Sequence, residues 1–238
     1  MNQPYYWNKS NFEGLTALAS ALRADPRLER LAKYCELREK GLRREAFAQL
    51  DAFLTEAASW DIPVQRALAV RVLETGWNAH DVHQFFTEPL RKRFLERVLE
   101  EWRAAEAGNH VPVGHLGLLQ RDRALLAEAL RLNSRDDRVR GTLASMLLYD
   151  VWYATHHLDE GSFIGSEDDA SASLTEAASI LAGAEDPSSV QNLNQELEDY
   201  TALLSDWKEY QRAPEGTFPD WCRARNRNRS WPARVYYS

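Results

Sequence analysis

Two pairs of histidines come nearest, by residue type and spacing, to a site that could perform chemistry. His80 and His83 are three residues apart, so they could share one face of a helix as metal ligands. A zinc-type site uses three or four protein ligands, however, and no cysteine or acidic motif accompanies this pair. We therefore interpret the two histidines as polar residues at the start of a helix, and we predict neither a metal nor another cofactor.

The second pair, His156 and His157, follows Trp152 and Tyr153 in a segment with helical character. Neighbouring side chains on a helix point about 100° apart, so we expect one histidine to be buried and hydrogen-bonded and the other to lie near the surface. Histidine titrates near neutral pH, which makes a general base the chemical role open to this pair. A structural hydrogen bond is the default for such residues, as it is for Asp150 on the same segment.

Motifs for nucleophilic or phosphate chemistry are missing from the sequence. The segment 161–165, Gly-Ser-Phe-Ile-Gly, places its serine outside the nucleophile position of a G-x-S-x-G elbow, and no predicted strand precedes it. A phosphate-binding loop, a dinucleotide fingerprint and an H-E-x-x-H zinc motif are also missing. We therefore predict a loop at 161–165 and a protein that is not an enzyme, with a helical hydrolase using His156 or His157 as the alternative.

Charge is distributed unevenly along the chain, whose formal net charge is −7. Between residues 159 and 209 there are thirteen acidic residues and a single basic one, Lys208, whereas residues 210–238 hold six arginines against two acids. We predict that acidic residues of this region bind a partner, with the candidate site made of Asp159, Glu160, Glu167, Asp168, Asp169, Glu196, Asp199 and Asp206.

A concentrated field of one sign favours a partner of the opposite sign and speeds its encounter. It disfavours nucleic acid as the ligand of this surface. We therefore predict a protein-binding module for a basic protein, most concretely a bacterial immunity protein that neutralises a basic toxin such as a nuclease. Two other interpretations stay open: Arg223, Arg225, Arg227 and Arg229 fold back and neutralise the acids, or the charge serves solubility alone.

The elements that position these residues are predicted to be helices. Strong helix formers dominate the chain of 238 residues, and Asp-Pro and Thr-Glu-Pro sequences mark helix starts. We expect a single helix over 113–132 and a helix over 136–158 that is apolar on nearly every side and therefore buried at the centre of the fold. After Pro187, apolar residues spaced alternately three and four apart predict a packing seam.

These patterns predict an all-α fold of about eight or nine helices, because no segment alternates with a period of two over a convincing length. We expect a single all-helical domain over 1–211 and an arginine- and aromatic-rich tail over 212–238 that packs on it.

One segment resembles a known repeat. Residues 129–136, Ala-Leu-Arg-Leu-Asn-Ser-Arg-Asp, are similar to the end of a tetratricopeptide repeat, with Ser134 where the repeat prefers proline. Residues 28–54 resemble a repeat more loosely, and the likeness covers about a third of the chain. It implies an array of antiparallel helix pairs with a groove for a peptide, and hence a peptide-binding adaptor as an alternative function. Without it, an irregular helical bundle remains.

The compartment is predicted from the cysteines and from hydropathy. Cys35 and Cys222 lie far apart and do not suggest a disulfide framework, so we expect reduced thiols. The N-terminus lacks the basic start and apolar stretch of a signal peptide, and no apolar run approaches about 20 residues. We expect a cytoplasmic protein without a membrane partner, and leave its oligomeric state open.

Overall fold

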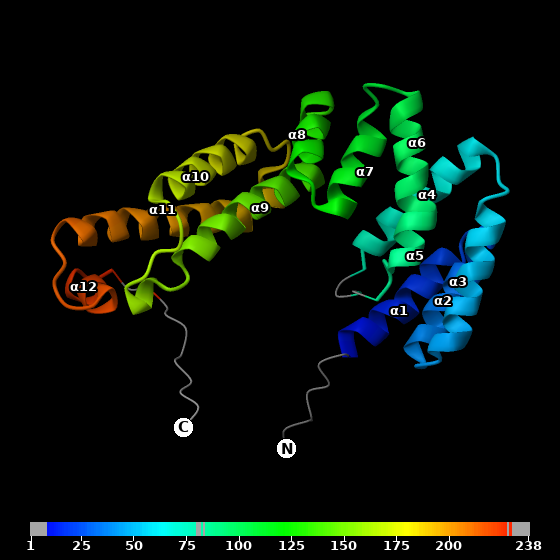
Figure 1. Ribbon diagram of the computed structural model, residues 1–238, viewed down its shortest axis with the longest axis horizontal. Helices are drawn as coiled ribbons and strands as arrows, with labels where there is room; N and C mark the ends of the chain where they lie inside the picture. The colour runs from blue at the N-terminus through cyan, green and yellow to red at the C-terminus, as the bar shows by residue number, and fades with distance from the viewer. Residues whose placement is uncertain (1–8, 80–81, 83, 228, 230–238) are drawn as a thin grey trace, which may run out of the picture. The chain divides into compact units, whose positions relative to one another are not determined.

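The computed structural model describes residues 9–79, 82, 84–227 and 229, and over these it confirms the all-α class (Figure 1). No strand occurs among them, and the helices number slightly more than predicted. The chain forms two compact units, residues 1–116 and 117–238, where the sequence predicts one domain over 1–211 and a tail. The division falls within a helix, and no linker composition marks it. His80 and His83 lie outside the described residues.

The first unit consists of consecutive helices that begin and end at local signals. Asp25 accepts a hydrogen bond from the backbone N–H of Arg27, and Gly41 adopts φ +74° between two helices, a conformation that glycine takes without strain. The elements are α1 (Lys9–Leu22), η1 (Pro26–Leu28), α2 (Glu29–Glu39), α3 (Arg43–Ala57), α4 (Ile62–Trp77), α5 (Glu88–Leu90), the π-helical η2 (Arg91–Glu96) and α6 (Arg97–Ala105).

Aromatic rings fill much of the first unit's core. Phe53 of α3 meets Trp60 and Phe94 edge-on, with ring centroids 5.8 and 5.4 Å away. Tyr34 of α2 is fully buried, and its hydroxyl donates to the backbone carbonyl of Gln84 at 3.0 Å. Edge-to-face ring contacts and a satisfied hydroxyl are the arrangements that stabilise buried aromatic side chains.

The prediction of a single helix over 113–132 is wrong, because the chain forms two helices there, α7 (His110–Gln120) and α8 (Arg123–Leu132). Arg121 adopts φ +53°, and the Asp122 carboxylate accepts a hydrogen bond from the N–H of Leu125 at 3.0 Å, which starts a new helix. Gly117 then lies against Leu126 of α8 so closely that a Cβ on it would meet Leu126 atoms at 3.0 Å. A continuous helix could not bring these two residues together.

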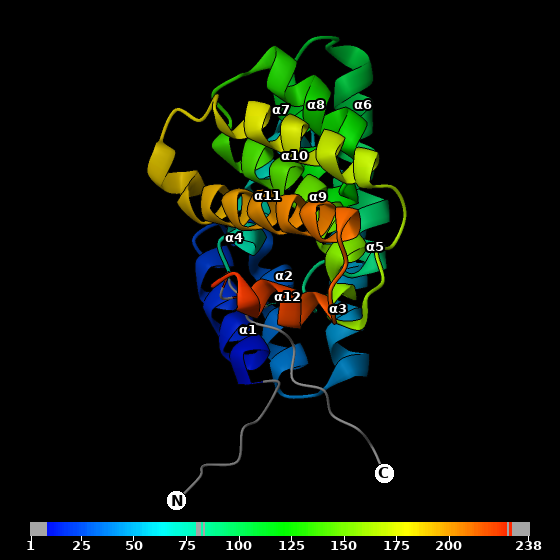
Figure 2. The ribbon, with the colours of Figure 1, turned by 90° about the vertical axis from the view of Figure 1, so that its left-hand side faces the viewer.

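Three long helices form the centre of the second unit, and α10 and α11 lie side by side in both views (Figures 1 and 2). The elements after α8 are α9 (Asp137–Thr155), η3 (Leu158–Glu160), α10 (Glu167–Leu181), η4 (Pro187–Val190), α11 (Gln191–Arg212) and α12 (Phe218–Ala224). The seam predicted after Pro187 is confirmed, since its side chains pack into the cores of this unit: Val190, Leu193, Leu197, Tyr200, Leu204 and Trp207.

The prediction that α9 is buried on nearly every side is wrong. Its stripe from Val139 to Ala154 is buried, as is Leu158 of η3, but Tyr149, Trp152 and Tyr153 are 58%, 41% and 53% exposed. Helices α10 and α11 pack on the buried side of α9, which leaves the side with these three rings open to solvent. The apolar character of a tryptophan or tyrosine does not reveal by itself which side a neighbouring helix covers.

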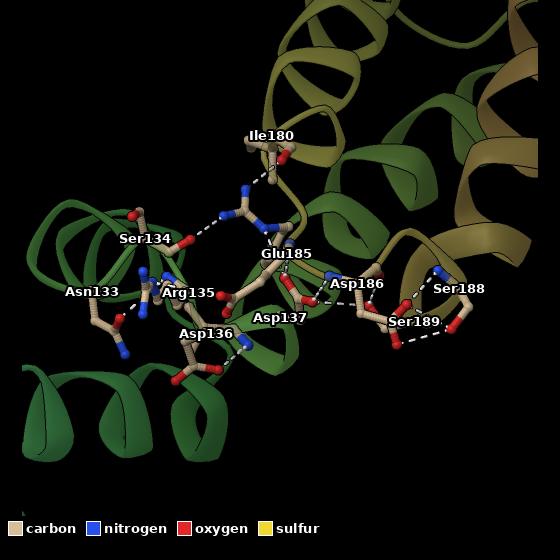
Figure 3. Close-up of polar contacts among 12 residues, drawn as sticks. Asn133, Ser134, Arg135, Asp136, Asp137, Ile180, Glu185, Asp186, Ser188 and Ser189 are labelled. Carbon is tan, nitrogen blue, oxygen red and sulfur yellow. Dashed lines mark hydrogen bonds and ion pairs between the residues drawn. The ribbon is translucent and has the colours of Figure 1, made fainter.

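A polar network joins the start of α9 to the loop between α10 and η4 (Figure 3). The Asp137 carboxylate accepts hydrogen bonds from the N–H groups of Asp186 (3.0 Å) and Glu185 (3.2 Å) and from the hydroxyl of Ser189 (3.1 Å). These bonds, led by that of Asp186, hold the pKa of Asp137 below its usual value. Arg140, 5% exposed, adds an ion pair with Asp137 and a hydrogen bond to the carbonyl of Ile180.

Residues 129–136 comprise the last turn of α8, a short turn and the residue that caps α9. Asn133 accepts a hydrogen bond from the N–H of Arg135, and Asp136 caps α9 by accepting from the N–H of Val139 at 3.0 Å. The relationship to tetratricopeptide repeats stays a prediction. The segment 161–165 is the predicted loop between helices, with Gly161 at φ +78°.

The two cysteines are free thiols and both are buried, Cys35 in the first unit and Cys222 in the second. Burial raises the pKa of each thiol. Within the described part of the chain, no helix combines the length and the apolar character needed to cross a bilayer.

Candidate functional site

The start of α10 carries an exposed part of the predicted acidic site. Ser166 caps the helix, and its hydroxyl accepts hydrogen bonds from the N–H groups of Asp168 (3.2 Å) and Asp169 (3.3 Å). Carboxylates in a first turn interact favourably with the positive end of the helix dipole, which explains why acids suit these positions. Both side chains are exposed, and neither forms an ion pair with a described lysine or arginine.

Two members of the predicted set, Asp159 and Asp206, are instead buried, at 9% and 5% exposure. Asp206 forms ion pairs with Arg227 and Arg229, the latter through Nε at 2.9 Å. Arg227 also donates to Glu209 at 2.8 Å, and Glu209 raises the pKa of this guanidinium. Neutralisation by the tail, which the sequence left open, therefore occurs at Asp206 and Glu209.

The tail reaches Asp206 because an aromatic cluster holds it on α11. Trp207 meets Phe218 of α12 edge-on at 5.2 Å between ring centroids, and Trp221 is 2% exposed beside them. The guanidinium carbons of Arg225 and Arg227 lie 4.2 and 5.1 Å from the centre of the Trp221 ring, within cation–π range. The start of the predicted tail thus packs on the second unit, and residues 228 and 230–238 lie outside the described residues.

The remaining members of the predicted set have more local partners. Glu160 pairs with His157 at 3.3 Å, and Glu167 accepts a hydrogen bond from the indole N–H of Trp207 at 2.9 Å. Asp199 accepts from the side-chain amide of Gln195 at 3.2 Å.

Glu196 affects a neighbouring phenol. Burial, together with the negative charge of Glu196, raises the pKa of Tyr200 to about 12. Tyr200 therefore stays protonated at neutral pH, and Glu196 lies against the half-buried part of α11 rather than out in solvent.

A shallow groove runs between α10 and α11. Its volume is about 520 Å³, and its floor includes Leu174 and Leu204. The lining residues are mostly small or apolar: Ser171, Leu174, Thr175, Ala178, Leu197, Thr201, Leu204, Ser205 and Lys208. The sequence patterns above did not predict this groove. The signal for it is the series of small residues on α10 and α11, which leaves a depression above the buried Leu174 and Leu204.

The two helices that form the groove are antiparallel. Trp207 donates to Glu167, and the Lys208 ammonium donates to the hydroxyl of Ser171 at 2.7 Å, so the start of α10 lies beside the end of α11. Lys208 consequently occupies the end of the groove near the start of α10. The other end, near Ala178, is formed by Leu197 and Thr201 of α11.

Two carboxylates border this groove. Residues seven apart lie almost in line along a helix, so Asp168 lies in line with Thr175 and Glu198 in line with Ser205. Glu198 is exposed and has no ion pair with a lysine or arginine that the structure describes. Because α10 and α11 are antiparallel, Asp168 borders the end of the groove with Lys208, and Glu198 the opposite end. The candidate site residues therefore do not form one continuous surface, since Asp169 and Asp199 lie on sides of their helices away from the groove.

A ridge of aromatic rings on α9 is the second exposed feature of this unit. Trp152 stacks on His156 with ring centroids 4.9 Å apart, and Tyr149 lies 5.1 Å from Trp152. The Nδ1 atom of His156 is 2.7 Å from the carbonyl oxygen of Tyr153, so it carries the proton and donates in this bond. Both histidines lie in the turn after α9 and are partly exposed, so the prediction that one of them is buried is wrong. Their contacts are with residues close to them in the sequence.

Among the described residues, no group of three or more histidine, cysteine, aspartate or glutamate side chains is arranged to hold a metal ion. Comparison with protein-family models, with curated proteins and with solved structures gives no match.

Proposed function

We propose that this chain is a protein-binding module without enzymatic activity, whose helices α10 and α11 bind a basic protein. One observation carries the proposal: Asp168, Asp169, Glu176 and Glu198 are exposed on these two helices and form no ion pair with a described lysine or arginine. Arg227 and Arg229 neutralise Asp206 and Glu209, and no described arginine of the tail pairs with these four.

Electrostatics gives the physical reason. The carboxylates on these adjacent helices repel one another. Lysines and arginines of a bound partner would attract the carboxylates and offset this repulsion. Such an interaction is screened by salt, because the Debye length falls from about 10 Å at 0.1 M to about 3 Å at 1 M ionic strength. The most specific form of the proposal is a bacterial immunity protein that blocks a basic toxin, for which the acidity of this region and its exposed aromatic side chains are suited.

The test begins with capture of partners from an extract of the source organism on the immobilised full chain. We expect a basic protein, bound in stoichiometric amount at about 0.1 M salt and released by about 1 M salt. The purified partner is then titrated against the triple variant Asp168→Asn, Glu176→Gln, Glu198→Gln. A matched control, Glu45→Gln, Glu74→Gln, Glu100→Gln, removes the same number of exposed charges from the first unit.

We expect the triple variant of α10 and α11 to lose affinity by about tenfold or more, and the control to bind within about twofold of the unmodified chain. Equal affinities for the two variants, or a captured partner that is not basic, would refute the proposal. A partner that stays bound at high salt would instead support a peptide-binding adaptor, the alternative that the α10–α11 groove favours. A bound small molecule or metal would revive the hydrolase alternative with His156 or His157.

A further inference from the structure

We infer that the groove between α10 and α11 holds the apolar side of a basic amphipathic helix supplied by the partner, an inference that rests on the proposed function. The groove is open and has an apolar floor. By helix geometry Asp168 and Glu198 border its two ends, and neither forms an ion pair with a described lysine or arginine. These features specify different parts of the same ligand.

The floor specifies the apolar side of the ligand. Leu174 is 7% and Leu204 is 4% exposed, and Leu197 is partly exposed beside them. The exposed side chains on the walls include Thr175 and Thr201, which are short enough to let another helix approach closely. Leucine-sized side chains at positions i, i+3, i+4 and i+7 of an entering helix would cover this floor.

The backbone requirements of the ligand favour a helix over an extended strand. An extended peptide needs partners for its own N–H and C=O groups, which sheet edges supply and helix surfaces do not. The walls of this groove offer a few hydroxyl groups, of which that of Ser171 already accepts a bond from Lys208. A helix satisfies its backbone internally and needs only side-chain contacts from the groove.

The borders specify the charge of the ligand. Asp168 and Glu198 lie at opposite ends and on opposite walls, so lysines or arginines on both flanks of the entering helix would each meet a carboxylate. Long basic side chains can lie along the apolar floor and still place their charges at these borders. Lys208, held by Ser171, repels a cation on the α11 side of that end, so the basic side chain there is expected on the α10 side, toward Asp168.

The experiment uses the full chain and two synthetic peptides of about 18 residues, or five helical turns. The first peptide carries leucines at helical spacing and lysines elsewhere. The second has the same composition, rearranged so that its leucines do not share a face. Fluorescence anisotropy with labelled peptides measures the two affinities. We expect the amphipathic peptide to bind about tenfold more tightly than the rearranged one.

Variants that fill the groove then test whether the peptide binds there. Ala178→Trp places a large ring inside it, whereas Ala172→Trp adds the same ring to an exposed position of α10 outside the lining. We expect the first variant to lose about tenfold in affinity for the amphipathic peptide and the second to stay within about twofold of the unmodified chain. Circular dichroism monitors folding, and Thr201→Trp with the control Ala202→Trp repeats the comparison on α11 if Ala178→Trp does not fold.

Equal binding of the two peptides, or equal binding by each groove-filling variant and its control, would overturn the inference. The proposed function would survive that result, because a basic partner could still bind the exposed carboxylates by charge alone. It fails separately, if the charge-neutralised triple variant binds the captured partner as the unmodified chain does.

Discussion

Substituting Asp206 by asparagine tests whether the ion pairs with the tail arginines hold the end of the second unit together. Asparagine keeps the volume of the side chain but removes its charge. Its amide group is a donor, so one of its two terminal atoms would face a guanidinium that also donates. Glu209→Gln is the matched control, because Glu209 is 47% exposed and, among the described residues, forms an ion pair only with Arg227.

The expected magnitude follows from the burial of the three side chains. Removing one partner of a buried ion pair costs about 3–5 kcal/mol. Arg227 and Arg229 keep 34% and 18% of their side-chain surface exposed, so they regain part of their hydration when Asp206 is neutralised. We therefore expect a loss of about 2–3 kcal/mol for Asp206→Asn, against about 0–1 kcal/mol for the exposed pair of Glu209→Gln.

Amide hydrogen exchange resolved by peptide is the assay, because it reports on the end of α11 and on α12 separately from the rest of the chain. A loss of 2–3 kcal/mol corresponds to exchange faster by about 30- to 150-fold for amides protected by this cluster. A double-mutant cycle with Arg229→Gln isolates the coupling between the two side chains. Exchange in Asp206→Asn within about threefold of that in Glu209→Gln would refute the reasoning.

Three further predictions concern stability, measured by urea unfolding. Because the pKa of Asp137 is lowered in the folded state, its carboxylate stabilises the fold fully above the pKa of an unfolded aspartate, about 4, and this contribution is lost as the pH falls through the folded pKa. Asp137→Asn should therefore lower the free energy of unfolding at pH 7 and reduce the difference in that free energy between neutral and acidic pH. An unchanged difference would contradict this prediction. Gly117→Ala should destabilise the chain by about 1–3 kcal/mol, because its Cβ would meet Leu126 of α8 at 3.0 Å. Gly141→Ala should stabilise it by about 0.5–1 kcal/mol, because the nearest contact of its Cβ is at 3.6 Å and alanine favours a helix over glycine. A change of stability in the same direction for both variants would refute this reasoning. Arg121→Gly should stabilise by up to about 1 kcal/mol, because φ +53° strains arginine but not glycine, and a loss of stability would show that the arginine side chain matters more.

Local signals made much of the fold predictable. The caps at Asp25 and Ser166 act within three residues of their own position, so a sequence window contains all that is needed to recognise them. The seam of α11 was predictable for the same reason, since the spacing of its apolar residues is written along one helix. The break before α8 has a local signal as well, in Asp122, but the surrounding residues are such good helix formers that they concealed it.

Other features depend on contacts between residues far apart in the sequence. Asp206 and Arg229 are separated by 23 residues, and nothing in either segment indicates that this aspartate, rather than Asp199, receives the arginine. The exposed side of α9 depends on where α10 and α11 pack, which apolar character alone does not reveal. The groove likewise required the relative placement of two helices, because small residues on one helix mark a groove only when small residues on another face them.

Each unit contains one buried thiol, which provides a natural reporter of its opening. Alkylating reagents attack the thiolate, so neither Cys35 nor Cys222 should react until its surroundings open. Mass spectrometry of the labelled peptides would give two reaction rates from one unmodified sample, one for residues 1–116 and one for residues 117–238. If a bound partner slows labelling of Cys222 while Cys35 reacts as before, the partner stabilises the second unit. This measurement needs no engineered probe.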